Sequence, residues 1–160
     1  MLAARTGAVQ RGQLQLTATL DPAPADGDPG LAESLVSNLV DNALRHNVPG
    51  GQVEIHTGQM AGRATISVRN TGPLIPPGEV DRLFQPFQRL TPGRTSQAAG
   101  HGLGLAITAA IADAHHATRT ARARPSGGLD ITVTFPPPAT QPGPSADLLN
   151  ESFMRTGAHE

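Results

Sequence analysis

The chain has 160 residues, 38% of them hydrophobic, and a formal net charge of −1. This length supports one domain with a real core, and the near-neutral charge argues against a general binder of nucleic acid or membrane surfaces, which usually carries a basic excess. The lack of cysteine excludes disulfides, zinc–thiolate sites and thiol catalysis. No apolar run approaches the roughly 20 residues of a membrane span, and the first residues do not form a signal peptide.

All twelve basic residues are arginine, so the chain contains no lysine. A P-loop NTPase requires a phosphate-binding lysine, and a protein kinase of the eukaryotic type requires a lysine on a strand. Both chemistries are therefore excluded. Any nucleotide has to be held by arginines, amides, backbone N–H groups or a metal ion.

The first half of the chain predicts a strand, a helix and a hairpin. Residues 14–20 alternate apolar and polar side chains, as a half-buried strand does. Asp28 and Pro29 indicate a helix start, and NVPGG ends that helix after His46. Residues 52–57 and 64–69 predict two strands joined by GQMAG in a hairpin. The apolar stripe of the helix consists of Leu31, Leu35, Val36, Leu39, Ala43 and Leu44.

The second half predicts a short helix in 77–87, a long loop over 88–102, and a buried helix over 103–116. A loop of that length inside a compact domain is usually functional. Strands at 118–124 and 129–135 form a second hairpin through PSGG. Because βαβ alternation is not sustained, we expect a two-layer α/β sandwich, with a mixed, largely antiparallel sheet and helices on one face.

The predicted first helix carries Asn38 and Asn42 four residues apart, with Arg45 on the same side. A carboxamide oxygen is a hard ligand suited to Mg²⁺, which also takes phosphate oxygens and water. Arg45 and His46 would then meet phosphate charge. Taken alone, the helix fits a solvated polar face equally well.

Two further motifs are weak when each is taken alone. GHGLGL, residues 100–105, places three glycines before a helix, where free N–H groups and the helix dipole favour an anion, although a flexible hinge has the same pattern. NTGP, residues 70–73, follows a strand, where an amide can recognise the edge of a base. The same four residues also form ordinary turns.

The Asn-rich helix, NTGP, the paired phenylalanines of LFQPFQR and GHGLGL occur in one order from about Gly12 to Pro136. Together they resemble the catalytic, ATP-binding domain of bacterial sensor histidine kinases, which belongs to the Bergerat-fold superfamily with gyrase, the Hsp90 chaperones and MutL. The combination is highly specific. The resemblance implies binding of ATP and Mg²⁺ and protein-histidine kinase activity.

SLVSNLVDNALRHNVPGG is similar to the N box of that family. The resemblance implies that Asn42 binds Mg²⁺, that Asn38 shapes the phosphate site, and that Arg45 and His46 lie near phosphate and nucleotide. In ATP-hydrolysing relatives a Glu at the position of Asn38 activates water. An asparagine is no general base, so the resemblance favours phosphoryl transfer over hydrolysis.

NTGPLIPP resembles the first glycine box, usually DxGxG, and departs from it twice. Asn70 replaces the Asp that accepts a hydrogen bond from the adenine amino group, and Leu74 replaces the second Gly, while Gly72 is retained. An asparagine carbonyl still accepts that bond without charge assistance, so we expect nucleotide binding to survive, with lower affinity.

LFQPFQR resembles the F box. Phe84 and Phe87 are expected to anchor a lid, residues 88–101, to the core, with Arg89 as the residue that grips the γ-phosphate and Arg94 as a weaker candidate; both arginines are equally compatible with a solvated loop. The second glycine box implies that nucleotide also contacts Gly100, His101, Gly102, Leu103 and Gly104. His115 and His116 are interpreted as structural.

No histidine lies in the context of a phosphoacceptor helix. We therefore expect a residual linker at 1–12, an ATP-binding catalytic domain at 13–136, and a disordered tail at 137–160. The expected partners are ATP, a dimerisation and phosphoacceptor domain of the same kinase, and a response regulator, with no nucleic acid. The fragment is expected to be monomeric and cytoplasmic, and the full protein to be a homodimeric, membrane-anchored receptor.

Two alternatives to the histidine kinase remain open. The first is an anti-sigma-factor serine kinase of the same fold. The second is a degenerate, nucleotide-free domain that serves as a protein-binding module, which the altered Asn70 and Leu74 keep in consideration.

Overall fold

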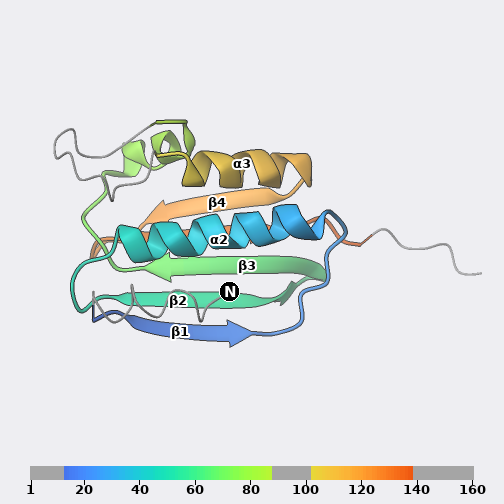
Figure 1. Cartoon of the computed structure of the whole chain (residues 1–160), viewed down its shortest axis with the longest axis horizontal. Helices are drawn as coiled ribbons and strands as arrows, with labels where there is room; N and C mark the ends of the chain where they lie inside the picture. The colour runs from blue at the N-terminus through green and yellow to red at the C-terminus, as the bar shows by residue number, and fades with distance from the viewer. Residues whose placement is uncertain (1–12, 88–101, 139–160) are drawn as a thin grey trace, which may run out of the picture.

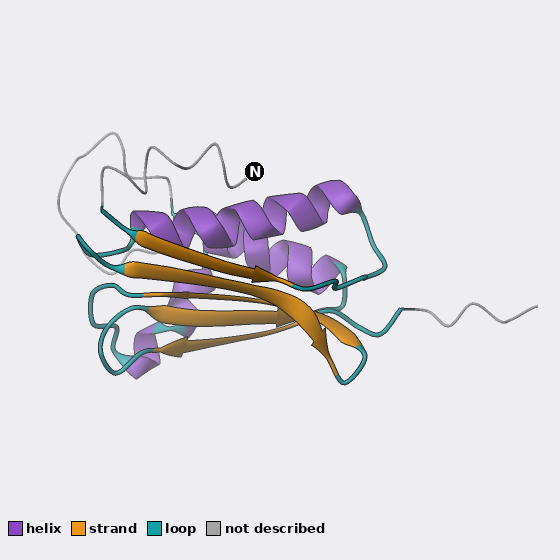
Figure 2. Ribbon diagram, turned by 90° about the horizontal axis from the view of Figure 1, so that it is seen from below, coloured by secondary structure: helices purple, strands orange, loops and turns teal. Residues whose placement is uncertain are grey.

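The computed structural model describes residues 13–87 and 102–138. A five-stranded sheet, in the order β1-β2-β3-β5-β4, carries α2 and α3 on one face (Figures 1 and 2). Strand β1 pairs with β2 in parallel, and the other neighbours are antiparallel. The predicted two-layer α/β sandwich is confirmed. The elements are β1 Gln15–Leu20, α2 Pro29–Arg45, β2 Gln52–Met60, β3 Arg63–Asn70, the 3-10 helices η2 Pro77–Glu79 and η3 Asp81–Phe84, α3 Gly104–Ala114, β4 Thr118–Ala123 and β5 Leu129–Thr134.

Helix α2 begins as its sequence predicts. Asp28 is the N-cap, its carboxylate accepts the N–H of Leu31 at 2.9 Å, and Pro29 stands at the first helical position. One member of the predicted stripe is wrong, because Leu31 is 42% exposed. The buried positions are Leu35, Leu39, Val40 and Ala43. At helical spacing, the stripe that these four buried residues form continues through Ala32. Leu31 therefore lies beside the stripe and not within it.

The hairpin β2–β3 is longer than predicted. Its strands extend to Met60 and from Arg63, so GQMAG is not the connection and the turn is Ala61-Gly62 alone. Both turn residues have positive φ, 51° and 73°, as a two-residue hairpin turn of type I′ requires.

The short helix predicted in 77–87 is two 3-10 turns. Glu79 N–H donates to the Pro76 carbonyl and Leu83 N–H to that of Val80, both three residues back. Prolines 76, 77 and 86 surround this segment and supply no N–H groups, which confines any helix to the few residues between them. The buried helix is confirmed as α3, which is shorter than predicted at both ends.

His115 joins three elements at the end of the domain where α2 begins. Its Nε2 accepts the N–H of Asp28 at 3.3 Å and its Nδ1 donates to the Ile111 carbonyl at 2.8 Å. Its ring meets the edge of Phe135 at the end of β5, with centroids 5.8 Å apart. These contacts support the structural interpretation of His115.

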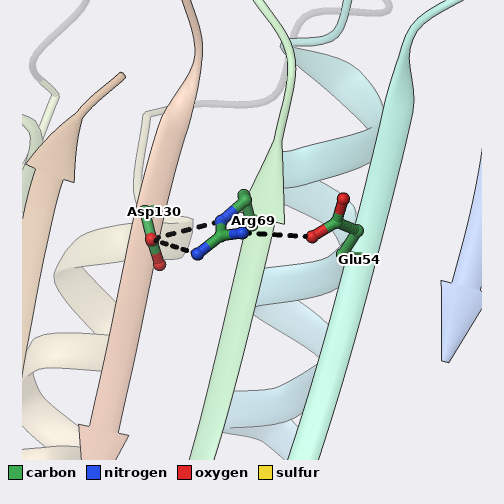
Figure 3. A network of polar contacts seen from close by, with 3 residues as sticks. All are labelled: Glu54, Arg69 and Asp130. Atoms are coloured by element: carbon green, nitrogen blue, oxygen red, sulfur yellow. Dashed lines mark hydrogen bonds and ion pairs between the residues drawn. The ribbon is translucent and has the colours of Figure 1, made fainter. Parts of the chain in front are cut away.

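The sheet face opposite the helices carries a row of charges (Figure 3). Arg69 on β3 donates to Asp130 on β5 at 3.1 Å and to Glu54 on β2 at 3.4 Å. All three side chains are partly exposed, so their ion pairs contribute little to stability. This row points away from the layer that holds α2 and α3.

Candidate functional site

Asn38 of α2 is held by its own helix. Its Nδ2 donates to the Ser34 carbonyl at 2.9 Å and lies 3.4 Å from the Ser34 hydroxyl. Its Oδ1 faces the start of α3, where a methyl group added to Gly104 would lie 3.5 Å away. The amide is therefore fixed by its own helix and lies beside the start of α3, and it cannot accept a proton from water.

Asn42 lies one turn further along α2 and is half-buried. Within residues 13–87 and 102–138 its side chain makes no hydrogen bond, so the carboxamide oxygen is available to a ligand. No group of three or more His, Asp or Glu side chains in these residues is arranged to hold a metal ion. Mg²⁺ needs no such cluster when phosphate oxygens and water complete its shell, so a single amide oxygen fits it.

Helix α3 starts without a cap. Leu103 precedes it and supplies no side-chain hydrogen bond, and the first α-helical bond runs from Ile107 N–H to the Leu103 carbonyl at 2.8 Å. The backbone N–H groups of the first turn therefore have no partner within the helix. They carry the positive end of the helix dipole and lie beside Asn38, so this helix end can bind a phosphate.

NTGP follows β3 at the same end of the sheet. Asn70 is 4% exposed, and its Nδ2 donates to the Thr71 carbonyl at 2.7 Å. Gly72 passes close to the end of α2, where an added methyl group would lie 2.7 Å from the His46 carbonyl oxygen. Only glycine fits there without a shift of backbone. Leu74 is 75% exposed.

Two contacts of the NTGP loop were not predicted from the sequence. The turn between β4 and β5 packs on it, because methyl groups added to Gly127 and Gly128 would collide with the backbones of Gly72 and Asn70. Both glycines have positive φ, and Gly128 N–H donates to the Pro73 carbonyl at 2.9 Å. The PSGG turn predicts a hairpin, but no local pattern shows which loop it contacts.

The second feature that was not predicted from the sequence is the contact made by Asn47. The Thr71 hydroxyl donates to Asn47 Oδ1 at 2.6 Å, and Asn47 Nδ2 donates to the Gln52 carbonyl at 3.0 Å. Gln52 N–H in turn donates to the Thr71 hydroxyl at 2.7 Å. This network ties the end of α2 and the start of β2 to the NTGP loop. In the sequence, Asn47 is recognisable as an asparagine just after a predicted helix. The same pattern occurs at ordinary helix ends.

The two phenylalanines of LFQPFQR differ in burial. Phe84 packs against the core, and the Arg119 guanidinium lies 5.2 Å from its ring centroid, as expected of an anchor. The expectation for Phe87 is wrong, because its side chain is 73% exposed. Its backbone N–H donates to the Gly102 carbonyl at 3.2 Å, so here the backbone, not the ring, makes the contact with the start of α3.

The structure brings Asn38, Gly104 and the start of α3 together, and it brings Asn70 and Gly72 to the end of α2. Arg45 and His46 are exposed at that same end of the helix. Arg89, Arg94, Gly100 and His101 lie outside the described residues. A cavity of about 260 Å³ lies beside the first turn of α2, near Asp28 and His115, at the other end of that helix.

This arrangement of sheet, helices and amides is that of an ATP-binding domain of the kinase and ATPase type. The chain belongs to the family of histidine kinase-, DNA gyrase B- and HSP90-like ATPases, whose sequence model matches residues 27–139. Among the described residues, no helix has the length and apolar character needed to cross a membrane.

Similar proteins are sensor proteins. The chain is 44% identical over 124 residues to the sensor protein CutS of Streptomyces coelicolor, a match that covers 77% of this chain and 30% of CutS. It is 34% identical over 137 residues to the sensor protein KdpD of Mycobacterium tuberculosis, covering 86% of this chain and 16% of KdpD. The chain therefore spans less than a third of either relative.

Solved structures share the fold. The mycobacterial sensor histidine kinase MprB superposes with a TM-score of 0.71 at 26% identity, covering 86% of this chain and 93% of that one. The catalytic domain of histidine kinase ThkA also gives 0.71, at 23% identity, covering 85% and 87%.

Proposed function

We propose that this domain binds Mg²⁺-ATP and transfers the γ-phosphoryl group to a histidine on a separate dimerisation domain, from which it passes to a response regulator. The observation that carries the proposal is the pair of amides on α2. Within the described residues the Asn42 side chain makes no hydrogen bond, which leaves its oxygen for the metal ion, and Asn38, held by Ser34 and lying beside Gly104, stands where a hydrolase of this family has its glutamate.

Each part of the site has a role in that reaction. The open first turn of α3 would supply N–H groups to the phosphates, and Asn42 would hold a metal ion that neutralises their charge. Asn70 accepts a hydrogen bond from the base, and Gly72 lets the ring lie close to the backbone. Arg45 and His46, and Arg89 beyond the described residues, add positive charge or donors near the phosphates.

The chemistry is positioning and charge neutralisation. A ring nitrogen of the acceptor histidine attacks the γ-phosphorus, the bond from that phosphorus to the bridging oxygen breaks, and ADP leaves with the electron pair. With Asn38 in place of a general base, water bound at this position is not activated. Transfer to a protein is thus favoured over hydrolysis.

A complex of one structural neighbour supports the proposed partners. A solved structure of histidine kinase ThkA is of its complex with response regulator protein TrrA, and it superposes on this chain with a TM-score of 0.66. We propose that this chain likewise serves a response regulator. In the full protein it would be the cytoplasmic part of a membrane-anchored homodimer.

Calorimetric titration with Mg²⁺-ATP and Mg²⁺-ADP tests the first step. We expect binding that falls at least about 100-fold in Asn42→Ala and falls likewise when EDTA removes the metal ion, because a bound metal ion loses a direct ligand. Glu33→Ala removes an exposed side chain from the same helix and is the matched control, with binding unchanged. Undetectable binding of nucleotide at millimolar concentration would reject the proposal in favour of a protein-binding module.

Transfer is tested with a histidine kinase dimerisation domain and radiolabelled ATP. The expected product is acid-labile, base-stable phosphohistidine on that domain. Acid-stable phosphoserine on an anti-sigma-factor antagonist, with no phosphohistidine, would instead identify a serine kinase of the same fold.

A further inference from the structure

We infer that Arg119 is a positioning residue for the start of α3. It holds η3 against α3, and η3 in turn fixes the backbone contact between Phe87 and Gly102 just before that helix. The inference rests on the proposed function, in which phosphate meets the start of α3. Arg119 itself touches no nucleotide and acts through Phe84.

Arg119 lies on the inner face of the edge strand β4. It shares that face with Ala121 and Ala123, which pack against the core, and it is opposite Val133, which is fully buried. Because side chains alternate along a strand, this arginine is directed toward the helices and not toward the charged outer face of the sheet. A charge in such a position requires partners.

Arg119 has its partners on two different elements. Its Nη1 donates to the Asp113 carboxylate of α3 at 3.0 Å, and its guanidinium carbon lies 5.2 Å from the centroid of the Phe84 ring of η3. The face of an aromatic ring attracts a cation at this distance. One side chain of β4 therefore holds both α3 and η3, which lie side by side (Figure 1).

The segment held in this way leads to a strained backbone contact. Phe87 N–H donates to the Gly102 carbonyl at 3.2 Å, and both residues have positive φ, 64° and 67°. Glycine adopts this conformation at little cost, whereas a phenylalanine keeps it only where its surroundings hold it. The Phe87 ring is 73% exposed and supplies little of that hold. Phe84 is the nearest preceding residue that packs against the core.

The contact lies two residues before the first residue of α3, Gly104. With Phe84 held, the Gly102 carbonyl has a fixed partner, and the N–H groups of the first turn of α3 are ordered before a phosphate arrives. Without that hold, a bound phosphate has to order the segment itself. The lost conformational freedom then lowers the affinity.

Calorimetric titration with Mg²⁺-ADP tests this role. Arg119→Gln is expected to weaken binding about 3- to 10-fold, and Arg119→Lys, which keeps the charge, should recover most of that loss. Phe84→Leu keeps an apolar side chain without the ring face and should weaken binding in the same way. Arg122→Gln removes the same charge from an exposed position on the other face of β4 and is the matched control, with binding unchanged.

Hydrogen exchange without nucleotide separates a positioning role from a general loss of stability. The Phe87 amide is expected to exchange faster in Arg119→Gln than in the wild type, while the amides of β3 keep their protection. A general destabilisation would accelerate the exchange of the most protected amides as well. An unchanged Phe87 amide would contradict the inference.

Phe87→Asn tests the connection between Arg119 and the strained backbone. Asparagine accepts positive φ more readily than phenylalanine does, and the ring that it replaces is exposed. In this background Arg119→Gln is expected to weaken ADP binding less than it does in the wild type. Equal losses in the two backgrounds would show that Arg119 does not act through Phe87.

Two results would overturn the inference and leave the proposed function intact. One is an unchanged ADP affinity in Arg119→Gln, and the other is an equal loss in Arg122→Gln. A wild-type domain that binds no nucleotide removes the proposed function, and the role of Arg119 falls with it.

Discussion

The N-termini of α2 and α3 are built in opposite ways. Helix α2 begins with Asp28, whose carboxylate accepts an N–H group of the first turn, and with Pro29, which has no N–H group to satisfy. Helix α3 begins after Leu103 with no side-chain cap. One helix end is capped by a side chain of the chain itself, and the other has no side-chain cap from its N-cap residue. Capping an N-terminus adds stability, whereas an open N-terminus offers its N–H groups to an anion, which is the role proposed for the start of α3.

The largest effect, on nucleotide affinity, is expected from a negative charge placed at the uncapped N-terminus of α3. Gly104→Asp places a carboxylate at the first residue of α3, where it would repel phosphate, and Gly104→Asn is its neutral match in shape. A side chain fits there, since the added Cβ would lie 3.5 Å from Asn38. We expect Mg²⁺-ADP to bind the Asp variant about 10-fold more weakly than the Asn variant in calorimetry. Equal affinities would show that phosphate does not approach this helix end.

Removing the N-cap of α2 is expected to affect only the stability of the domain. Asp28→Ala removes the cap of α2 and is expected to lower the free energy of unfolding by about 1 kcal/mol, measured by denaturant titration. Asp28→Asn, which retains the capping oxygen, should stay close to wild type. Mg²⁺-ADP affinity is expected to be unchanged in both variants. A loss of affinity in Asp28→Ala would mean that the two ends of α2 are coupled.

The smallest effect is expected from the outer face of the sheet (Figure 3). Arg69→Gln changes the net charge by the same amount as Gly104→Asp, but at a side chain directed away from the helices. We expect a loss of stability of at most about 1 kcal/mol, smaller at high salt, with Mg²⁺-ADP affinity unchanged. Were Arg69→Gln to weaken ADP binding as much as Gly104→Asp does, the effect of Gly104→Asp would reflect overall charge and not the helix end.

Local signals were sufficient for most of the fold. Asp28-Pro29 and the apolar spacing predict α2, and period-two alternation predicts the strands, because each of these signals lies within one element. The errors occur where the element ends depend on other parts of the chain. Leu31 is apolar but lies beside the stripe that the sheet covers, and Phe87 lies after a proline that ends the second 3-10 turn.

The candidate site was predictable as a set of motifs, and less so as a geometry. The motif residues could be named because four short patterns occur in a specific order. The partners that position them are Asn47 and the pair Gly127 and Gly128, which come from elsewhere in the chain and whose local patterns do not show which loop they contact. A sequence shows which residues are present, whereas the close approach of two loops depends on how the whole sheet is assembled.

The contact between the NTGP loop and the β4–β5 turn has an evolutionary consequence. Gly72 and Gly127 are far apart in sequence, yet an added methyl group on Gly127 would enter space taken by the Gly72 backbone. Once one loop has been pushed aside by a larger residue, enlarging the other meets less resistance, so the two substitutions cost less together than their separate effects would suggest. Epistasis of this kind would make the two loops vary as a pair, and it would link the proposed base site to a hairpin that contributes none of the proposed nucleotide contacts.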